Sequence, residues 1–434
     1  METSQTWIAN VAILNKLLAK ESWFNTFWAK FSGNVDISSD DNGNNVYRPS
    51  GNPIEMLSDF VAQGRDNMLI PFLSDLSGSP VFGDTVLKGT GEDQTMKWLR
   101  SFVNQYRKAV MKRSGQMSEQ RQKLYKLYDQ ARPQMARWFT KWENQAIFQT
   151  FYDGVSPNLS EGTNSDGLGV SKRYHPNWYG HTADGVLSAV GTEKALTLNG
   201  DLDTAVGMTA ATAGTADTTI SAKMLRALRI KMMELKIPQI ITKDGYRYWA
   251  LVIHPVQHMA LLADSDYLNA YRYGNMGKGA GNMPEVNGMS GYYSGFCIFE
   301  DIIGIREWDE AGYFFGATTS ARFDPTAVTL HADASSKRIY NAIAFGNGAL
   351  GKGVAQNLHF TNEVDDHANT IEVGGAMING YNRADFVAEN KAGDSSGYAD
   401  GQVFSKGNAA VSEYNTANPA VNQSSLIVAT AETP

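Results

Sequence analysis

Eight residues near the end of the chain come closest to a recognisable chemical site. They are GNGALGKG at 346–353, directly after an expected strand, and they match the GxGxxG pattern of dinucleotide-binding proteins. They also differ from a phosphate-binding P-loop at one position, because Gly353 stands where Ser or Thr would bind Mg²⁺. Both motifs need a following helix whose N-terminus receives the phosphates, whereas VAQNLHFTNE is strand-like. We therefore predict a glycine-rich turn or edge strand, with a nucleotide-binding enzyme as the alternative.

Two histidines, His254 and His258, have a four-residue spacing that metal sites use. Pro255 begins a helix between them, and the motif contains neither a third ligand nor a glutamate base. Residues 38–43 resemble part of a calcium loop, but Pro49 occupies the position of the bidentate glutamate. We predict that neither segment binds a metal ion.

The remaining candidates are single residues or a simple cluster. Cys297 has no adjacent base, and the apolar run FCIFEDII around it favours a core thiol over a cross-link. The chain has no GxSxG elbow, and the acidic cluster of Glu363, Asp365 and Asp366 is typical of a solvated turn. We therefore expect no catalytic, cofactor-binding or metal-binding residues, no cofactor, and a protein that is not an enzyme.

The composition predicts a folded protein of two or three domains with a weakly charged surface. Hydrophobic residues make up 42% of the 434 residues, but charged residues only 19%, below the usual quarter. Such a surface suits dense packing against copies of the same chain. The net charge of −7 argues against a dedicated DNA-binding protein, and no apolar run of about 18 residues is present to span a membrane. We expect no signal peptide, and the single cysteine excludes an internal disulfide and fits a reducing cytoplasm.

A long helix is predicted over residues 118–152. Apolar residues recur there at intervals of three or four and share one helix face: Leu124, Tyr128, Ala131, Met135, Trp138 and Trp142. Ser118 can cap its start, and Asp153-Gly154 supplies a stop. At about 1.5 Å per residue the helix would be about 50 Å long, which is typical of a structural backbone. Pro133 should bend this helix, or else divide it in two.

Two segments before this helix are expected to need another surface. Residues 1–31 predict an apolar helix that packs either on its own core or on a partner. Residues 66–113 predict two long extended segments around a Gly-rich connection, since Met96, Trp98 and Phe102 alternate with charged residues. An arm of this length cannot bury itself, so we expect it to lie on another surface, with a self-contained sheet as the alternative.

The second half of the chain predicts a mixed α/β layer. We expect helices at 221–235 and from Pro255 to about Asn269. Expected strands are 195–198, 246–254, 296–305, 339–345 and the terminal SSLIVATA. This succession of helices and strands indicates helices packed on a sheet.

Five segments also occur in the order found in a known protein family. They are FLSDLSGSPVFGDTVLKGTGED, VNQYRKAVMKRSGQMSEQRQKLYKLYDQARPQMARWF, LVIHPVQHMALLADSDYLNAYR, GFCIFEDIIGIREW and HFTNEVDDHANTIEVGGAMINGYNRADF. On these segments, from about Asn67 to Phe386, the chain resembles the major capsid proteins of N-four-like and related tailed phages. The fold of that family is of the Hong Kong 97 type.

The resemblance implies an α+β Hong Kong 97-type capsid fold with five parts. These are an N-terminal arm (1–65), an extended β-hairpin loop (66–116), a peripheral domain (117–219) with its spine helix (118–152), an axial α/β domain (220–330), and returning strands with a C-terminal tail (331–434). Pro133 departs from the straight spine that the resemblance implies.

The resemblance further implies a structural major capsid protein that self-assembles into the icosahedral head of a tailed bacteriophage with a double-stranded DNA genome. Its expected partners are copies of itself in hexamers and pentamers, packaged DNA through weak non-specific contacts, and portal and scaffold or decoration proteins, but no membrane. Its expected location is the virion capsid, after assembly in the bacterial host cytoplasm.

The stretch from Lys97 to Lys141 is strongly basic. It contains 12 Lys or Arg against two acidic residues, while the rest of the chain has 26 against 43. The local net charge is therefore +10, and that of the remainder is −17. We predict that Lys123, Lys126, Arg137 and Lys141 face either acidic patches of neighbouring subunits or packaged DNA, with a solvated basic face as the alternative.

Overall fold

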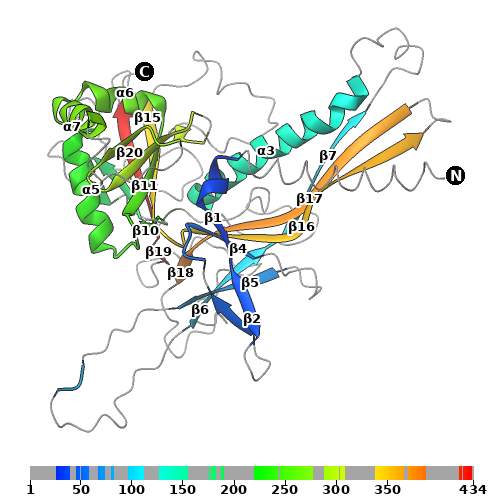
Figure 1. The fold of residues 1–434 in the computed structure, drawn as a ribbon, viewed down its shortest axis with the longest axis horizontal. Coiled ribbons are helices and arrows are strands. Elements are labelled where there is room, and N and C mark those ends of the chain that lie inside the picture. Colours follow the sequence, from blue (N-terminus) through cyan, green and yellow to red (C-terminus); the bar gives the residue numbers. More distant parts are fainter. Residues whose placement is uncertain are drawn as a thin grey trace.

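The computed structural model shows one compact lobe and one elongated lobe (Figure 1). The structure describes residues 26–39, 45–48, 50–57, 67–73, 80–82, 96–111, 127–154, 175, 177–181, 187–189, 219–242, 245–276, 288–302, 304–307, 338–365, 370–387, 420–422 and 424–432. Among these residues, no helix is both long enough and apolar enough to span a membrane.

The compact lobe is built on a nine-stranded sheet of mixed direction. Its strands are β8 (Trp178–His181), β9 (Leu187–Ala189), β10 (Ile240–Ile241), β11 (Arg247–Ile253), β12 (Gly291–Tyr293), β13 (Phe296–Glu300), β14 (Arg306–Glu307), β15 (Arg338–Phe345) and β20 (Ser425–Glu432). The main order is β12-β13-β11-β15-β20-β8-β9, with β10 and β14 pairing to β11 and β15. β11 is parallel to β13 and antiparallel to β15, so strands from distant parts of the chain meet at the centre of the sheet.

Most of the strands predicted for this lobe are confirmed. The predictions at 246–254, at 339–345 and at the end of the chain correspond to β11, β15 and β20. The prediction of one strand over 296–305 is wrong, because β13 ends at Glu300 and the Asp301 carboxylate then accepts the Gly304 N–H in a turn. The predicted strand at 195–198 lies outside the described residues.

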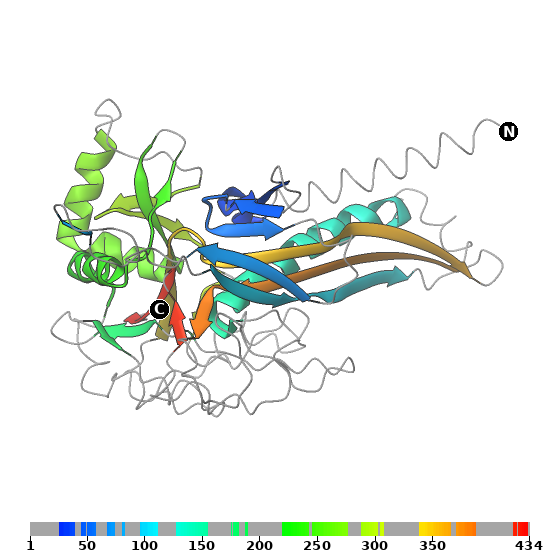
Figure 2. The ribbon, with the colours of Figure 1, turned by 90° about the horizontal axis from the view of Figure 1, so that it is seen from below.

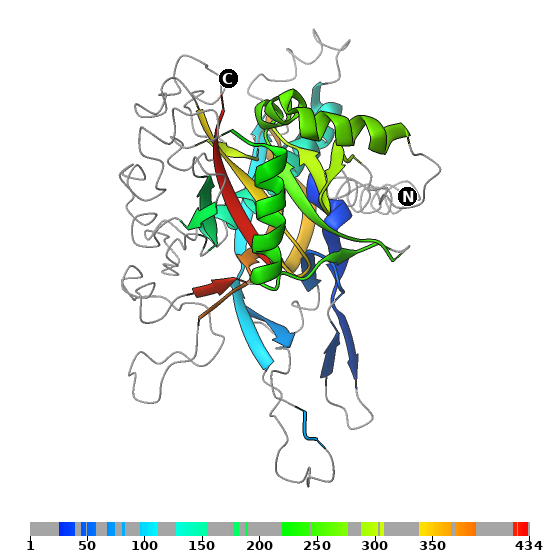
Figure 3. The same ribbon diagram turned by 90° about the vertical axis from the view of Figure 1, so that its left-hand side faces the viewer.

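Helices α5 (Ala222–Glu234), α6 (Pro255–Ala263) and α7 (Ser265–Met276) cover one face of this sheet (Figure 3). The helix predicted at 221–235 is confirmed as α5, which Ser221 caps by accepting the Met224 N–H. The single helix predicted from Pro255 to Asn269 is wrong. Asp264 has extended dihedral angles and ends α6, and its carboxylate accepts the N–H groups of Ala222 and Asp266 instead.

The elongated lobe is built on a five-stranded sheet with the order β1-β4-β16-β17-β7. These strands are β1 (Ser32–Asn34), β4 (Ile54–Leu57), β7 (Asn104–Met111), β16 (Leu350–Asp365) and β17 (Thr370–Arg383). The two long strands, β16 and β17, form an antiparallel hairpin that projects from the compact lobe, and β7 pairs with β17 along the outer part of this hairpin (Figures 1 and 2).

Helix α3 (Leu127–Asp153) lies along the elongated lobe beside this sheet (Figure 2). Of the two alternatives left open by Pro133, the structure shows one helix that continues through the proline. Residues 118–126 of the predicted helix lie outside the described residues. The predicted stop is confirmed, because Gly154 adopts a φ of 78° and its N–H bonds to the Thr150 carbonyl.

Three two-stranded sheets complete the described fold. They pair β2 (Asp36–Ser39) with β3 (Asn45–Arg48), β5 (Asn67–Leu73) with β6 (Met96–Phe102), and β18 (Asp385–Val387) with β19 (Ala420–Asn422). The predicted return of the chain from β5 to β6 is therefore confirmed as an antiparallel pair. The continuation of this segment, β7, leaves the hairpin and joins the chain's own five-stranded sheet.

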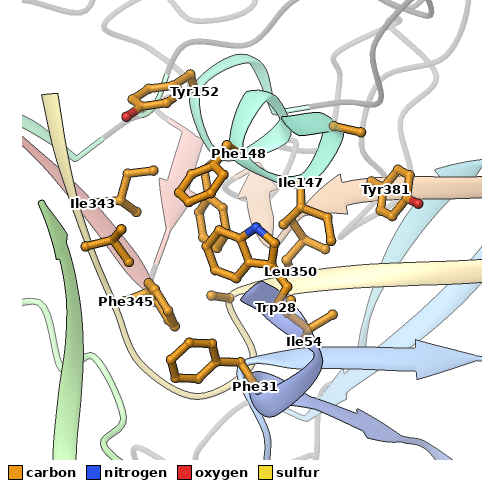
Figure 4. Packing of buried hydrophobic residues seen from close by; sticks show 14 of the residues in the cluster. Trp28, Phe31, Ile54, Ile147, Phe148, Tyr152, Ile343, Phe345, Leu350 and Tyr381 are labelled. Atoms are coloured by element: carbon orange, nitrogen blue, oxygen red, sulfur yellow. The ribbon is translucent and has the colours of Figure 1, made fainter. Parts of the chain in front are cut away.

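A cluster of aromatic side chains joins the two lobes (Figure 4). It is centred on the 3-10 helix η1 (Phe27–Phe31), whose Trp28 is fully buried. The Trp28 ring stacks on Phe151 of α3 at 5.1 Å and lies 5.6 Å from Phe345 of β15. The prediction of one helix over residues 1–31 is wrong at its end, because Thr26 is extended and residues 27–31 form a separate 3-10 helix that packs on the chain's own core. Residues 1–25 lie outside the described residues.

Candidate assembly surface

The glycine-rich segment after β15 is a packed turn and not a phosphate-binding loop. The backbone N–H groups of Gly346, Asn347 and Gly348 bond to the carbonyls of Ser424, Pro238 and Asn52. These donors are therefore already used, and strand β16 follows the turn in place of a helix. The predicted turn is confirmed, but the alternative of an edge strand is wrong because β16 lies between β4 and β17.

The lysine of this segment forms a buried charge network. Lys352 is 4% exposed, and its Nζ lies 2.5 Å from Oε1 of Glu143 on α3. The Tyr381 hydroxyl donates to the same oxygen at 2.7 Å. Burial lowers the pKa of Lys352, which Glu143 opposes, and burial raises the pKa of Tyr381 so that its hydroxyl remains a donor. This network fixes α3 to the hairpin of β16 and β17.

A second buried cation fixes the other end of α3. Arg383 is fully buried, and its guanidinium donates to the carbonyls of Phe151 and Tyr152 in the last turn of the helix. These carbonyls have no partner within the helix and carry the negative end of its dipole, so a cation is stabilising there. Sequence reasoning missed Glu143, Tyr381 and Arg383. The signal it could have used is a charged residue inside an apolar or glycine-rich segment.

The two histidines with metal-like spacing have structural roles. His254 caps α6 through Nδ1, which accepts the Val256 N–H, and Gln257 completes the capping box. His258 lies with its Nδ1 2.5 Å from Glu300 Oε1 on β13. Within the described part of the chain, no group of three or more His, Cys, Asp or Glu side chains could hold a metal ion.

A serine and a histidine also meet, but not in a catalytic arrangement. His175 Nε2 lies 2.8 Å from Oγ of Ser425 at the start of β20. His175 Nδ1 accepts the Asn177 N–H, so in the neutral ring the proton resides on Nε2. This tautomer donates to Ser425 and cannot take its proton, and both side chains are buried. The contact therefore stabilises the end of the sheet.

His175 should make the protein less stable in acid. Burial and the charge of Arg383 hold the pKa of His175 well below its usual 6.5. Below pH 6.5 the unfolded chain binds a proton that the folded chain does not. The contribution of the neutral His175 to the free energy of unfolding is therefore fully present above that pH and is lost as the pH is lowered. Between pH 6.5 and 5.5 we expect His175 to lower the free energy of unfolding, measured in urea, by up to about 1.4 kcal/mol per pH unit. The variant His175→Gln should lose this contribution; an unchanged slope would contradict the assignment.

The remaining sequence candidates are placed as follows. Cys297 is fully buried in β13, as predicted for a core thiol. Glu363 and Asp365 lie on the last residues of β16, so the prediction of a solvated turn is wrong for them, and Asp366 lies outside the described residues. Residues 38–43 fall at the hairpin of β2 and β3, of which 40–43 are also outside the described residues.

The elongated lobe presents an exposed basic face. Arg137 and Lys141, one turn apart on α3, are exposed, as is Lys108 on β7. Arg107 is also exposed, but it lies on the other face of the sheet because successive strand residues point to opposite faces. The Lys108 Nζ lies 5.4 Å from the centre of the half-buried Trp138 ring, which links Lys108 to α3. Lys123 and Lys126 of the predicted basic set lie outside the described residues.

The same face ends in an open strand. β7 is the outermost strand of its sheet, and no strand of the described residues pairs with its outer side. Residues 107–110 of β7 are exposed, including Val110 at 38%. Unpaired edges are templates for association, and charged side chains restrict which partners they accept. The lobe thus combines an open backbone edge with cations, an arrangement suited to a subunit of a larger assembly.

Solved structures share this architecture. The capsid of Ralstonia phage GP4 aligns with a TM-score of 0.57 at 14% identity, covering 88% of this chain and 88% of that chain. The cyanophage Pam1 capsid aligns with a TM-score of 0.55 at 15% identity, covering 88% and 89%. The head of Helicobacter pylori bacteriophage KHP40 aligns with a TM-score of 0.51 at 8% identity, covering 94% and 90%. These similarities show a phage capsid fold of mixed α and β structure.

Residues 37–402 match the family described as phage capsid protein, and the chain belongs to this family. No curated protein matches the sequence. The protein is thus a bacteriophage major capsid protein, a structural component of the virion capsid, and no finding supports a nucleotide-dependent enzyme.

Proposed function

We propose that copies of this chain assemble into the icosahedral head of a tailed bacteriophage with a double-stranded DNA genome. The observation that carries this proposal is the elongated lobe, whose basic face and outer β7 edge are left uncovered by the described residues. Many such contacts, each weak, would sum to a stable shell. The arrangement of a long helix, a projecting hairpin and a compact α/β lobe supports a fold of the Hong Kong 97 type, and the resemblance of the five sequence segments supports the N-four-like family.

Within this proposal, the chain divides into the five parts that the sequence predicts. The arm (1–65) gives η1, β1 and β4 to this subunit, and the loop (66–116) gives it β7, while the hairpins β2-β3 and β5-β6 are the parts proposed to reach neighbouring subunits. The peripheral domain (117–219) contains α3, and the axial domain (220–330) contains α5, α6 and α7. The last part (331–434) returns strands to both lobes, which is supported by β15 and β20 in the compact lobe and by β16 and β17 in the elongated lobe. Scaffold, portal and decoration proteins are further proposed partners, with assembly in the host cytoplasm.

Negative-stain microscopy of the purified full-length protein tests the assembly. We expect shells or ring-shaped capsomers, together with fast-sedimenting species in analytical ultracentrifugation. A protein that remains monomeric under all ionic conditions, including in the presence of co-expressed phage head proteins, would contradict the proposal.

Deleting residues 77–93 should abolish shells without unfolding the subunit. The segment between β5 and β6 is rich in glycine, with Gly78, Gly83, Gly89 and Gly91, and we expect it to contact a neighbouring subunit. We expect the deletion variant, closed by a short glycine linker, to show the circular dichroism and thermal transition of the intact monomer but no particles by microscopy. Normal particles would show that the loop is not an inter-subunit element.

Reversing the charges of Arg137 and Lys141 should impair assembly or DNA retention. Both cations are exposed and one helical turn apart on α3. The glutamates of Arg137→Glu and Lys141→Glu would therefore repel either DNA phosphates or acidic patches of neighbouring subunits. We expect at least a severalfold loss of DNA-filled particles, and raising the salt concentration should weaken the wild type in the same direction. The control Arg137→Lys with Lys141→Arg keeps the charges and should behave as wild type. Unchanged particle yield and DNA content in the reversed variant would indicate a solvated face.

A further inference from the structure

The outer face of α5 carries three basic side chains followed by two exposed apolar ones. The face that packs on the sheet is fully buried through Met224, Leu225, Leu228 and Met232. The opposite face exposes Lys223, Arg226, Arg229, Ile230, Met233 and Glu234. Glu234 is paired with Lys231 at 3.0 Å, and we name the other five residues the α5 stripe. Ile230 is 60% exposed and Met233 is 51% exposed, which is unusual for two large apolar side chains one turn apart on one helix.

The charges of the stripe are only partly matched within the subunit. Arg226 forms an ion pair with Asp266 at 2.7 Å. Among the described residues, no carboxylate forms an ion pair with Lys223 or Arg229. The stripe therefore presents uncompensated positive charge next to exposed apolar area, in a chain with a net charge of −7.

A surface of opposite character lies on the same lobe. Met259 on α6 is 71% exposed, and Ile302, in the turn after β13, is 63% exposed. Glu300 is exposed and Asp301 half-buried, and both directly precede Ile302 in the chain. Glu300 also connects to α6, because its Oε1 lies 2.5 Å from Nδ1 of His258, the residue before Met259. We name these four residues, Met259, Glu300, Asp301 and Ile302, the α6 patch. It combines apolar side chains with carboxylates where the stripe combines them with cations.

The exposed apolar residues of the stripe and the α6 patch lie toward opposite ends of the strands of the compact sheet. The start of α5 is held at the end of α6, where Asp264 accepts the Ala222 N–H. The segment after α5 instead reaches the opposite ends of the strands, because the Pro238 carbonyl accepts the Asn347 N–H of the turn that follows β15. Because β15 is antiparallel to β11 and β13, the turn after β15 lies at the end of the sheet where β11 and β13 begin, whereas Glu300 lies where β13 finishes. Figure 3 shows α5 running along the strands from one of these ends to the other. One subunit therefore cannot close the two surfaces on each other.

We propose that the α5 stripe of one subunit packs against the α6 patch of the next subunit in the same capsomer. This proposal rests on the proposed assembly of the chain into a shell, and it names the residues of one contact. Two different, complementary surfaces on one chain form a head-to-tail contact, which closes into a ring when the rotation between subunits permits. Ile230, Met233, Met259 and Ile302 would be buried at its centre, with Arg229 and Glu300 giving register at its rim.

Packaged DNA is the competing occupant of the stripe. Phosphate contacts use Lys, Arg and polar donors and gain little from exposed Ile and Met side chains. The exposed Ile230 and Met233 beside the cations, and the presence of a matching acidic and apolar surface on the same lobe, favour a second copy of this chain.

Two full-length variants test the contact. The stripe variant carries Arg229→Glu and Ile230→Glu, and the patch variant carries Met259→Asn and Ile302→Asn, so that the two altered surfaces cannot attract each other. We expect each variant alone to lose at least tenfold in particle yield. Because each retains one intact surface, an equimolar mixture should form dimers with one copy of each variant, measured by light scattering and native mass spectrometry, and should not grow into rings.

The controls separate this contact from folding and from the proposed function. Arg272→Glu changes an exposed cation of α7 that belongs to neither surface and should assemble normally. The milder variants Ile230→Gln and Met259→Gln should keep the wild-type melting temperature and still lose yield. Wild-type yield in both variants, or a mixture without dimers, would overturn the pairing, as would a stripe variant that assembles but no longer retains DNA. Failure of the wild type itself to assemble would instead contradict the proposed function.

Discussion

Replacing Lys352 by methionine should destabilise the elongated lobe by about 3–5 kcal/mol. The substitution keeps a long side chain but leaves the carboxylate of Glu143, which is 5% exposed, without its cation in a buried site. An unpaired buried charge costs far more than the loss of an exposed ion pair, which is worth less than about 1 kcal/mol. Hydrogen exchange of the α3 amides in the full-length protein should report the loss as faster exchange.

The double variant Glu143→Gln with Lys352→Met provides the control. It removes both charges and keeps an oxygen that can accept the Tyr381 hydroxyl, so most of the lost stability should return. If the double variant were as unstable as Lys352→Met alone, the loss would come from packing and not from the unpaired carboxylate.

The sequence allowed good prediction of elements whose signal is local. Helix α5 was predictable because its buried residues recur every three or four positions after a serine cap, and β11 because YWALVI is continuously apolar. The end of α3 was predictable from the glycine at 154. The break between α6 and α7 was not, because it depends on the Asp264 carboxylate bonding to Ala222, 42 residues away in the sequence.

The contacts that hold the assembly surface in place could not be predicted, for the same reason. Lys352 and Glu143 are separated by 209 residues, and nothing in the local pattern of either one indicates the other. Lys352 instead suggested a phosphate-binding lysine, because a glycine-rich turn has the same local sequence whether its N–H groups point to a ligand or, as here, to other carbonyls. The position of β7 at the sheet edge likewise depends on its pairing with β17, a strand more than 250 residues later.

Trp28 is the residue whose loss should most weaken the connection between the lobes. Its ring lies 4.6 Å from Phe148 and 5.1 Å from Phe151 of α3, and 5.6 Å from Phe345 of β15. Figure 4 shows Trp28 between Phe148 and Phe345. Trp28→Ala would leave a cavity among these rings, and we expect a loss of about 3–5 kcal/mol in the free energy of unfolding. Because the cavity borders both lobes, amide exchange should accelerate in the last turns of α3 and in β15 together.

The variant Trp28→Phe distinguishes ring packing from hydrogen bonding. Among the described residues, the buried indole Nε1 has no hydrogen-bond partner, so phenylalanine removes a polar group that gains nothing from burial there. We expect this variant to lose less than about 1.5 kcal/mol, well below the alanine variant. Acceleration of exchange confined to α3 in Trp28→Ala would contradict the bridging role, since it would show that β15 holds its position without the tryptophan.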